Sequence, residues 1–348
     1  MKSTASGGTV SRRAFIYGLA PVSIVLGTGL TPQPVAGQKP EPMTVRWGGT
    51  TSIELQTPLY VALNHGFLAE EGLKVDGVML APGPRVREAL AANELDFGDV
   101  GTFTYIVGRR VGLPQRIVFE YYSKEIFSLF VPAKFQSQIK SVADLKGKSV
   151  AVTAQGASTH MAGLSFVRKA GLKDADVKFV GLQSGDPAVW ITAFEQGTFE
   201  GGIVWEPIST YLIDRKAGVP LVDVRDREAH DKWVGKSAAS MVLSVNEDLI
   251  AKKPEVIQKA VRALRKALAY IRSHSAAEVA AAAAPNFKME PALLARILEP
   301  IKGNFSPDGR ISRSGIAVEV DLALAGGVLK QRLSFEEMVD TRFAGSTD

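Results

Sequence analysis

The stretch ALAANELDFGDV, residues 89–100, recurs as AFEQGTFEGGIV, residues 193–204, about a hundred positions later. In each copy, Asn93 or Gly197 stands where the C-cap of a helix needs a left-handed residue. An acid follows three residues later, and a short apolar run of the kind that forms a buried strand comes next. Each copy therefore predicts the end of a helix followed by the start of a strand.

A second pair of segments repeats at nearly the same offset. Residues 44–49 lead through a Thr/Ser loop to a predicted helix near Pro58. Residues 148–153 lead in the same way to a predicted helix near Ser158. The sequence therefore predicts two similar, Rossmann-like α/β lobes. Because ligands of open α/β sheets bind beyond the carboxyl ends of the strands, two facing lobes predict one ligand cleft between them.

Strands and helices alternate through both predicted lobes, which favours a largely parallel sheet in each. In the first lobe we expect strands at 44–48, 73–80, 96–100, 115–119 and 127–131, and helices at 58–70, 85–92 and 102–111. In the second we expect strands at 148–153, 177–181 and 201–205, and helices at 141–145, 158–170 and 187–196. A strand at 238–245 would return the chain to the first lobe, followed by helices at 255–273, 275–284, 291–298 and 334–339.

The N-terminal segment has the features of an export signal. The pair Arg12-Arg13 precedes a charge-free apolar stretch, Ala14 to Leu30, which is typical of a twin-arginine signal peptide. A single membrane anchor is the alternative, although the stretch is short and rich in glycine for a span. Small residues beside a predicted processing point lead us to interpret 1–37 as signal peptide and the proline-rich 38–43 as a linker.

The composition favours an exported globular protein with two domains. A length of 348 residues with 46% hydrophobic residues suffices for two cores. The absence of cysteine excludes disulfides, thiolate metal sites and a lipidated cysteine. Of the 41 basic residues, Lys2, Arg12 and Arg13 belong to the leader, which leaves 38 against 36 acidic residues and does not favour a nucleic-acid partner. We expect a free periplasmic monomer.

Four segments, 48–57, 99–105, 153–161 and 205–209, are predicted to meet in the cleft. They contain many hydroxyl side chains and neither Lys nor Arg. Helix N-termini carry unpaired N–H groups and a partial positive charge, so an anion could be held there without a basic side chain. Each hydroxyl could instead be an ordinary helix cap. The candidates are Thr50, Thr51, Ser52, Thr102, Thr104, Thr153, Ser158 and Thr159.

Other side chains of these segments are candidates with open alternatives. His160 lies in the first turn of its predicted helix and could donate to an anion or satisfy a carbonyl group in the core. Trp205, together with Phe103 and Tyr105, could form an aromatic wall for an organic ligand or belong to the core. Glu54 and Glu206 could pair with an amine of a zwitterionic ligand, or could be solvated or capping residues.

The sequence lacks the common catalytic motifs. It has no thiol, no His-x-x-x-His pair for zinc, and no Gly-x-Ser-x-Gly elbow, Walker loop or dinucleotide fingerprint after a strand. The four histidines are scattered over different predicted elements. We therefore expect no enzymatic activity, no bound metal and no cofactor.

Four runs in the sequence occur in an order that is specific for one superfamily. They are PLYVALNHGFLAEEGLKV at 58–75, residues 89–101, SVADLKGKSVAV at 141–152 and WEP at 205–207. Together they resemble the aliphatic-sulfonate, taurine and nitrate type of periplasmic solute-binding protein, over roughly residues 44–270. The resemblance implies the membrane permease of an ABC importer with its ATPase as partners, but its motifs do not specify the ligand. The hydroxyl-rich loops without arginine and the aromatic residues favour a small organic anion.

The resemblance also implies a type II periplasmic-binding-protein fold, in which two crossing strands join the lobes and act as a hinge. We place the crossings near 130–132 and 239–241, so that lobe 1 comprises 44–131 and 240–348 and lobe 2 comprises 132–239. The ligand contacts implied by position are Thr51, Ser52, Gly101, Thr102, Ser158, Thr159, His160, Trp205 and Glu206.

Two alternatives to transport stay open at this point. One branch of the wider superfamily makes a pyrimidine in an iron-dependent, self-consuming reaction, but its cysteine-rich motif is absent here and an export signal does not fit it. A ligand-sensing periplasmic partner of a membrane receptor would use the same cleft. The ligand itself stays open among sulfonate, carboxylate, nitrate and pyrimidine.

Overall fold

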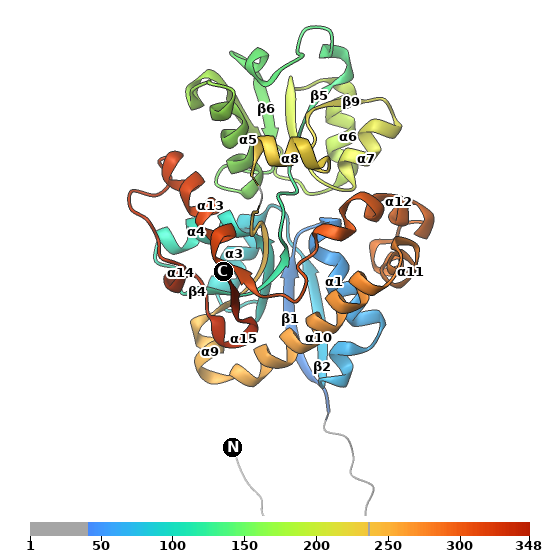
Figure 1. Ribbon diagram of the computed structural model, residues 1–348, viewed down its shortest axis with the longest axis vertical. Helices are drawn as coiled ribbons and strands as arrows, with labels where there is room; N and C mark the ends of the chain where they lie inside the picture. The colour runs from blue at the N-terminus through green and yellow to red at the C-terminus, as the bar shows by residue number, and fades with distance from the viewer. Residues whose placement is uncertain (1–40, 236) are drawn as a thin grey trace, which may run out of the picture. The chain divides into compact units, whose positions relative to one another are not determined.

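Two five-stranded sheets dominate the computed structural model, which describes residues 41–235 and 237–348. Each sheet with its flanking helices is called a lobe here (Figure 1). The predicted signal peptide, 1–37, and linker residues 38–40 lie outside the described residues. The predicted two-lobed α/β fold is confirmed.

The two sheets share one strand order, β2-β1-β3-β10-β4 in the first and β7-β6-β8-β5-β9 in the second. In both, the first three strands are parallel, and the fourth is antiparallel to its neighbours. The first sheet contains β1 (Met43–Gly49), β2 (Leu73–Met79), β3 (Phe97–Gly101), β4 (Gln115–Tyr122) and β10 (Met241–Asn246). The second contains β5 (Ser128–Pro132), β6 (Ser149–Val152), β7 (Lys178–Gly181), β8 (Gly201–Val204) and β9 (Gly218–Val222).

The repeated stretch forms the same helix-to-strand turn in both lobes. α3 (Gly83–Ala91) leads into β3, and α6 (Pro187–Gln196) leads into β8. Asn93 and Gly197 have φ angles of 56° and 60°, so both hold the left-handed conformation that the pattern predicts. The acid after each turn accepts a backbone N–H from the neighbouring strand: Asp96 from Arg46 at 2.8 Å, and Glu200 from Ser149 at 2.9 Å.

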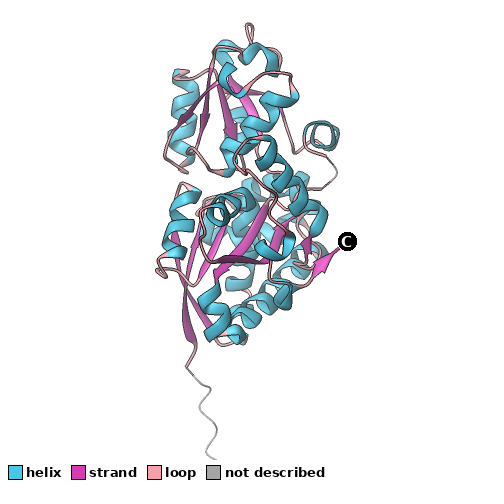
Figure 2. Ribbon diagram, turned by 90° about the vertical axis from the view of Figure 1, so that its left-hand side faces the viewer, coloured by secondary structure: helices cyan, strands magenta, loops and turns pink. Residues whose placement is uncertain are grey.

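Helices cover both faces of the first sheet (Figure 2). α1 (Ile53–Asn64) and α2 (Phe67–Glu70) replace the single helix predicted over 58–70, because Gly66 between them has a φ of 73°. α1 also begins earlier than predicted, since Ser52 Oγ accepts the N–H of Leu55 at 3.1 Å and caps the helix. α4 (Thr102–Arg110) follows β3 directly.

The C-terminal residues add more helices to the first lobe. They are α9 (Glu247–Lys252), α10 (Pro254–Ser273), α11 (Ala276–Phe287), α12 (Pro291–Ile301), α13 (Arg313–Ala325), α14 (Phe335–Met338) and α15 (Thr341–Ala344), with short strands β11 (Ile311–Ser312) and β12 (Ser346–Thr347). α10 buries an apolar stripe against α1 and α2, as its helical spacing predicts. Its basic face forms ion pairs from Arg262 to Glu71 and from Lys266 to Glu70.

The second lobe is smaller. Its helices are α5 (Ser158–Lys169), α6, α7 (Ile208–Asp214) and α8 (Arg227–Trp233), with the capped turn η2 (Val142–Leu145) that Ser141 and Asp144 predict. β9, α7 and α8 were not expected. Pro220 interrupts the strand pattern of β9, and each of the two helices has only seven residues.

The first crossing between the lobes lies between β4 and β5, at residues 123–127 rather than 130–132 (Figure 1). The strand that we assigned to the end of lobe 1 pairs with β8 and β9 in the second sheet. Ser128 Oγ also accepts the N–H of Val224 there, at 3.1 Å. An apolar strand sequence carries no signal for which of two sheets it joins. Of the described residues, 234–235 and 237–240 form the return crossing, which overlaps the expected 239–241.

Candidate ligand-binding cleft

A cavity lies between the two lobes and encloses about 450 Å³ of empty space, including its open mouth. Residues from both sheets' strand-to-helix turns line it, together with part of the first crossing. None of the described residues that line the cavity carries a charged side chain. The lining residues are Thr50, Thr51, Ser52, Ala81, Pro82, Gly83, Val100, Gly101, Thr104, Ile126, Phe127, Thr153, Ala157, Ser158, Thr159, Gly185, Trp205 and Met241.

Hydrogen bonds join the two lobes around this cavity. Thr51 Oγ1 of the first lobe donates to the carbonyl oxygen of Gly185 in the second, at 2.7 Å. The hydroxyls of Thr104 and Ser158 face each other across the cleft at 3.3 Å. Trp205 Nε1 donates to the carbonyl oxygen of Thr51 over a longer distance, 3.5 Å. The structure therefore represents a closed arrangement of the lobes.

Gly101 permits the closest approach of the two lobes. A Cβ atom at this position would lie 2.1 Å from Ser158 Oγ and 2.7 Å from Ser158 Cβ. The backbone of Gly101, with φ −62° and ψ 140°, is one that any residue adopts. The glycine is therefore needed for space across the cleft and not for its own backbone conformation.

The N-terminus of α5 points unpaired donors at the cavity. Ala157 occupies the N-cap position, where its side chain cannot cap the helix. The N–H groups of Ser158 and Thr159 have no hydrogen-bond partner within the described part of the chain. These donors and the positive end of the helix dipole suit a negatively charged or strongly polar ligand atom.

The predicted hydroxyls divide into structural and free groups. Ser52 caps α1. Thr102 is fully buried, and its hydroxyl donates to the carbonyl oxygen of Ala239. Thr153 and Thr159 share a hydrogen bond of 2.8 Å with each other inside the second lobe.

Ser158 and Thr104 remain for a ligand, along with the hydroxyl of Thr50, which has no partner among residues 41–235 and 237–348. Because the hydroxyls of Thr104 and Ser158 bond only to each other within the described residues, over 3.3 Å, hydroxyls that a ligand could engage come from both sides of the cleft.

Four residues predicted as ligand contacts do not line the cavity: Thr102, Phe103, His160 and Glu206. Phe103 is core, with 1% of its surface exposed. Nδ1 of His160 accepts the N–H of Gly156 at 3.3 Å, and burial lowers the pKa of His160, which favours its neutral form. These side chains lie behind the cavity wall.

Glu206 belongs to a buried charged cluster, where Arg225 Nη1 donates to its carboxylate at 2.6 Å. Burial raises the pKa of Glu206, while Arg225 and the hydroxyl of Thr210 oppose that rise. Glu54 lies close by, fully buried, and burial together with the charge of Glu206 raises its pKa well above the usual range. Both acids are thus buried, and neither lines the cavity.

An aromatic wall closes one side of the cavity. Trp205 packs edge-to-face on Trp190, with ring centroids 5.4 Å apart, and on Phe127 at 6.1 Å. Phe127 belongs to the first crossing, and Gly185 belongs to the loop before α6. Sequence reasoning missed both of these lining residues because no local pattern marks a loop or a crossing segment as part of a site.

Asp99 lies directly behind the cavity lining of the first lobe. Its carboxyl group is completely buried and accepts hydrogen bonds from Trp47 Nε1 at 2.6 Å and from the Tyr121 hydroxyl at 2.9 Å. Burial raises the pKa of Asp99 to about 8, although both hydrogen bonds favour the charged form. The carboxyl group is therefore largely neutral at pH 7.

The matched part of the chain identifies its family. Residues 55–277 match the family model described as NMT1/THI5 like. The chain belongs to this NMT1/THI5-like family. The match begins in α1 and ends in α11, so it includes both sheets' cleft-forming turns except the first loop.

Relatives in this family are named as binding proteins. A protein of Escherichia coli K12 named as an aliphatic sulfonates-binding protein is 33% identical over 134 residues, which cover 38% of this chain and 40% of that protein. The match thus spans less than half of that relative's length. The Bacillus subtilis binding protein YtlA is 24% identical over 293 residues, covering 82% of this chain and 84% of that protein.

Solved structures show the same fold. The alkanesulfonate-binding protein SsuA from Xanthomonas axonopodis pv. citri, bound to MOPS, superposes with a TM-score of 0.70 at 22% identity, covering 86% of this chain and 99% of that one. The periplasmic nitrate-binding protein NrtA from Synechocystis PCC 6803 gives a TM-score of 0.68 at 15% identity, covering 86% and 85%.

Two further observations concern metals and membranes. Within residues 41–235 and 237–348, no group of three or more His, Asp or Glu side chains is arranged to hold a metal ion. In the same part of the chain, none of the helices combines the length and apolar character needed to cross a bilayer.

Proposed function

We propose that this protein is the solute-binding component of an ABC importer and captures a small organic anion between its lobes. One observation carries the proposal: a cavity shared by both lobes, where hydroxyls from both sides and the unpaired N-terminus of α5 converge. The names of the sulfonate-binding relatives support the same ligand class.

The chemistry of the lining favours an anion that also has an organic part. The N–H groups of Ser158 and Thr159 can donate to a sulfonate or carboxylate oxygen without a basic side chain. Trp205 and Phe127 offer an apolar wall that a bare inorganic ion would leave unused. A sulfonate or carboxylate on a small carbon skeleton uses both features.

Closure follows from the distribution of contacts. A ligand that touches Thr50 in one lobe and Ser158 in the other gains all its hydrogen bonds only when the lobes meet. It therefore binds the closed state more tightly and shifts the population toward it. The closed lobes would then present one combined surface to a membrane permease and its ATPase. No chemical step is required of the protein, which we propose acts as a monomer, without enzymatic activity, metal or cofactor.

The predicted leader supports a periplasmic location for this function. We propose that residues 1–37 direct export through the twin-arginine pathway and are then removed. A reporter fused to the leader should be exported with Arg12-Arg13 intact and should stay inside the cell when both residues are changed to Lys. Export that does not change with this substitution would contradict the proposed pathway.

A thermal-shift screen of residues 38–348 tests the proposed ligand class. The panel contains alkyl and aryl sulfonates, taurine, sulfate esters, nitrate, aromatic carboxylates and pyrimidines. A ligand at about 100 times its dissociation constant adds about 2.7 kcal/mol to the free energy of unfolding, which raises the melting temperature measurably. We expect stabilisation by organic sulfonates or carboxylates. Stabilisation by nitrate or pyrimidines alone would contradict the proposed ligand class.

A further inference from the structure

We propose that a second groove, at the mouth of the cleft, is a ligand subsite. It would bind the far end of an elongated organic anion, and that end would be an aromatic ring that bears an N–H or O–H donor. This inference rests on the proposed function and specifies its ligand. The groove encloses about 1210 Å³ of empty space including solvent, and both lobes contribute to it. We call it the mouth groove; it is lined by Thr51, Gln56, Tyr60, Met79, Asp186, Pro187, Ala188, Ile191, Thr192, Pro207, Tyr211, Arg215, Asn286, Phe287, Lys288 and Met289.

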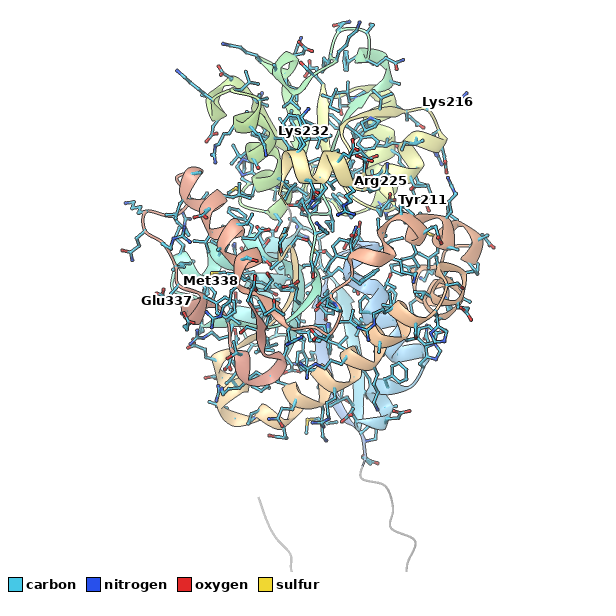
Figure 3. The ribbon with its side chains drawn as sticks, in the orientation of Figure 1. Tyr211, Lys216, Arg225, Lys232, Glu337 and Met338 are labelled. Atoms are coloured by element: carbon cyan, nitrogen blue, oxygen red, sulfur yellow. The ribbon has the colours of Figure 1, made fainter. Side chains whose placement is uncertain are left out.

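Aromatic and apolar side chains form opposite walls of the mouth groove. In the first lobe, Tyr60 of α1 and Phe287 of α11 pack edge-to-face with ring centroids 4.7 Å apart. In the second lobe, Tyr211 of α7 and Ile191 of α6 line the groove. Figure 3 shows Tyr211 on the side of its lobe that is turned toward the first. A flat apolar group between these walls would bury surface against both lobes.

Gln56 gives the mouth groove an unused polar group. Its side chain is only 1% exposed, and Nε2 donates to the carbonyl oxygen of Thr50 at 3.0 Å. Its Oε1 atom is buried and has no hydrogen-bond partner within the described residues, although the side chain lines the groove. A buried acceptor without a donor is costly, so a ligand that brings an N–H or O–H group to Oε1 gains that hydrogen bond.

The rim of the mouth groove is basic, unlike the inner cavity. Arg215 and Lys288 line it from opposite lobes. Arg215 is 60% exposed and forms only a loose pair with Glu195 at 3.5 Å. Asp186, the acid of the groove, caps α6 by accepting the N–H of Ala188. Exposed positive charge at the entrance attracts an anion from solution before it reaches the uncharged cavity.

Thr51 connects the two compartments. It lines both the inner cavity and the mouth groove, and its hydroxyl bonds to Gly185 at the boundary between them. A ligand that is longer than the inner cavity must pass this hydrogen bond. Its anionic head would then lie at the N-terminus of α5, and its distal ring would lie between Tyr60 and Tyr211.

Three probes of increasing size test the subsite by calorimetry on residues 38–348: ethanesulfonate, 4-phenylbutane-1-sulfonate and 4-(4-hydroxyphenyl)butane-1-sulfonate, each with the corresponding carboxylate. We expect the ring to tighten binding at least tenfold over the short probe, and the hydroxyl to add several-fold more. In Gln56→Met the gain from the hydroxyl should disappear, so that both ring-bearing probes bind equally.

Tyr211→Ala should remove most of the gain from the ring, and Ile213→Ala is its control, because Ile213 lies on the same helix, is 44% exposed and does not line the groove. Equal binding of short and ring-bearing probes would overturn the subsite and leave the proposed function standing. A gain from the ring that survives Tyr211→Ala, or a gain from the hydroxyl that survives Gln56→Met, would also overturn it. Failure of all six probes to bind would contradict the proposed function and the subsite together.

Discussion

The two lobes repeat one framework but use the starts of their helices differently. In the first lobe, Ser52 caps α1, and Thr102 ties the start of α4 to Ala239. In the second lobe, Ala157 leaves the N-terminus of α5 without a side-chain cap, and the donors of that turn face the cavity. The same strand order therefore supports a closed, structural turn in one lobe and an open, binding turn in the other.

The buried acids beside the cleft differ in the same way. Asp99 in the first lobe has hydrogen-bond donors but no basic partner among the described residues, and burial raises its pKa to about 8. Glu206 in the second lobe is paired with Arg225, which also holds Asp223. One lobe thus tolerates a buried carboxyl by neutralising it, and the other by pairing it. Loss of the basic partner should therefore destabilise the second lobe, and a rise in pH should destabilise the first.

Removing Arg225 should have the largest effect. Arg225→Met leaves the buried carboxylate of Glu206 without its partner, which typically lowers the free energy of unfolding by about 3 to 5 kcal/mol. Urea denaturation at pH 7 measures this loss. Adding Glu206→Gln should recover much of it, because no unpaired charge remains. Arg296→Met, which breaks the exposed pair with Asp214, is the control and should cost about 1 kcal/mol or less. Equal losses for both arginines would contradict the comparison.

A methyl group at Gly101 should interfere with closure. Because its Cβ would lie 2.7 Å from Ser158 Cβ, rotation of the serine cannot relieve the collision and the lobes must separate. We expect Gly101→Ala to weaken the ligand found in the screen by about ten- to a hundredfold, which is about 1.4 to 2.7 kcal/mol. Gly303→Ala, where a Cβ meets nothing within 4 Å, is the matched control. Calorimetry that gives wild-type affinity for Gly101→Ala would show that binding does not need this approach.

Asp99 should make stability depend on pH. Its pKa is about 8 in the folded protein against 3.8 for an ordinary Asp, so between these values the unfolded chain releases a proton that the folded chain keeps. The free energy of unfolding should therefore fall as the pH rises from about 4 to 8, by up to about 1.4 kcal/mol per pH unit for this one group.

Burial raises the pKa of Glu120 and Glu125 to about 7, and both act in the same direction. Asp99→Asn, which keeps an acceptor for Trp47, should make the decline shallower. The free energy of unfolding is measured by denaturation at several pH values between about 4 and 8. If it falls equally steeply with pH in the variant and the wild type, the assignment of a neutral carboxyl group at Asp99 is contradicted.

The smallest effects should separate a cap from a ligand contact. Ser52→Ala should lower the free energy of unfolding by about 1 kcal/mol and change the ligand affinity little, because Ser52 Oγ accepts the N–H of Leu55. Ser158→Ala should leave stability nearly unchanged and weaken an anionic ligand by about 1 to 2 kcal/mol. Paired melting and calorimetry experiments on both variants give the comparison. If Ser158→Ala lowered stability and Ser52→Ala weakened binding, Ser158 would be the helix cap and Ser52 the ligand contact, which would contradict the comparison.

Long periodic patterns predicted the framework well. α10 follows from its apolar spacing, and the turns at Asn93 and Gly197 follow from the repeat. Short elements were missed where local signals conflict, as in β9 with Pro220, and the 13-residue helix α13 was also not predicted. The first crossing was placed a few residues late, because whether β5 joins the first or the second sheet depends on its pairing with β8 and β9 and not on its own residues.

The candidate site was predictable only where local sequence patterns mark its residues. Turns after parallel strands are visible in a sequence, and Thr51, Gly101 and Ser158 do line the cavity. The pairing of Glu206 with Arg225, 19 residues later, depends on how a loop folds back and has no local signal. The mouth groove was not foreseen, because helices from distant parts of the chain build it.

Small-angle X-ray scattering tests the central claim most directly. Residues 38–348 are measured alone and with a saturating concentration of the ligand that stabilises them, at a concentration that calorimetry shows to be fully bound. Our account predicts that the radius of gyration falls when the ligand is added, because both lobes contact it only when they are closed. A radius of gyration that does not change on full occupancy would contradict binding by closure of the lobes.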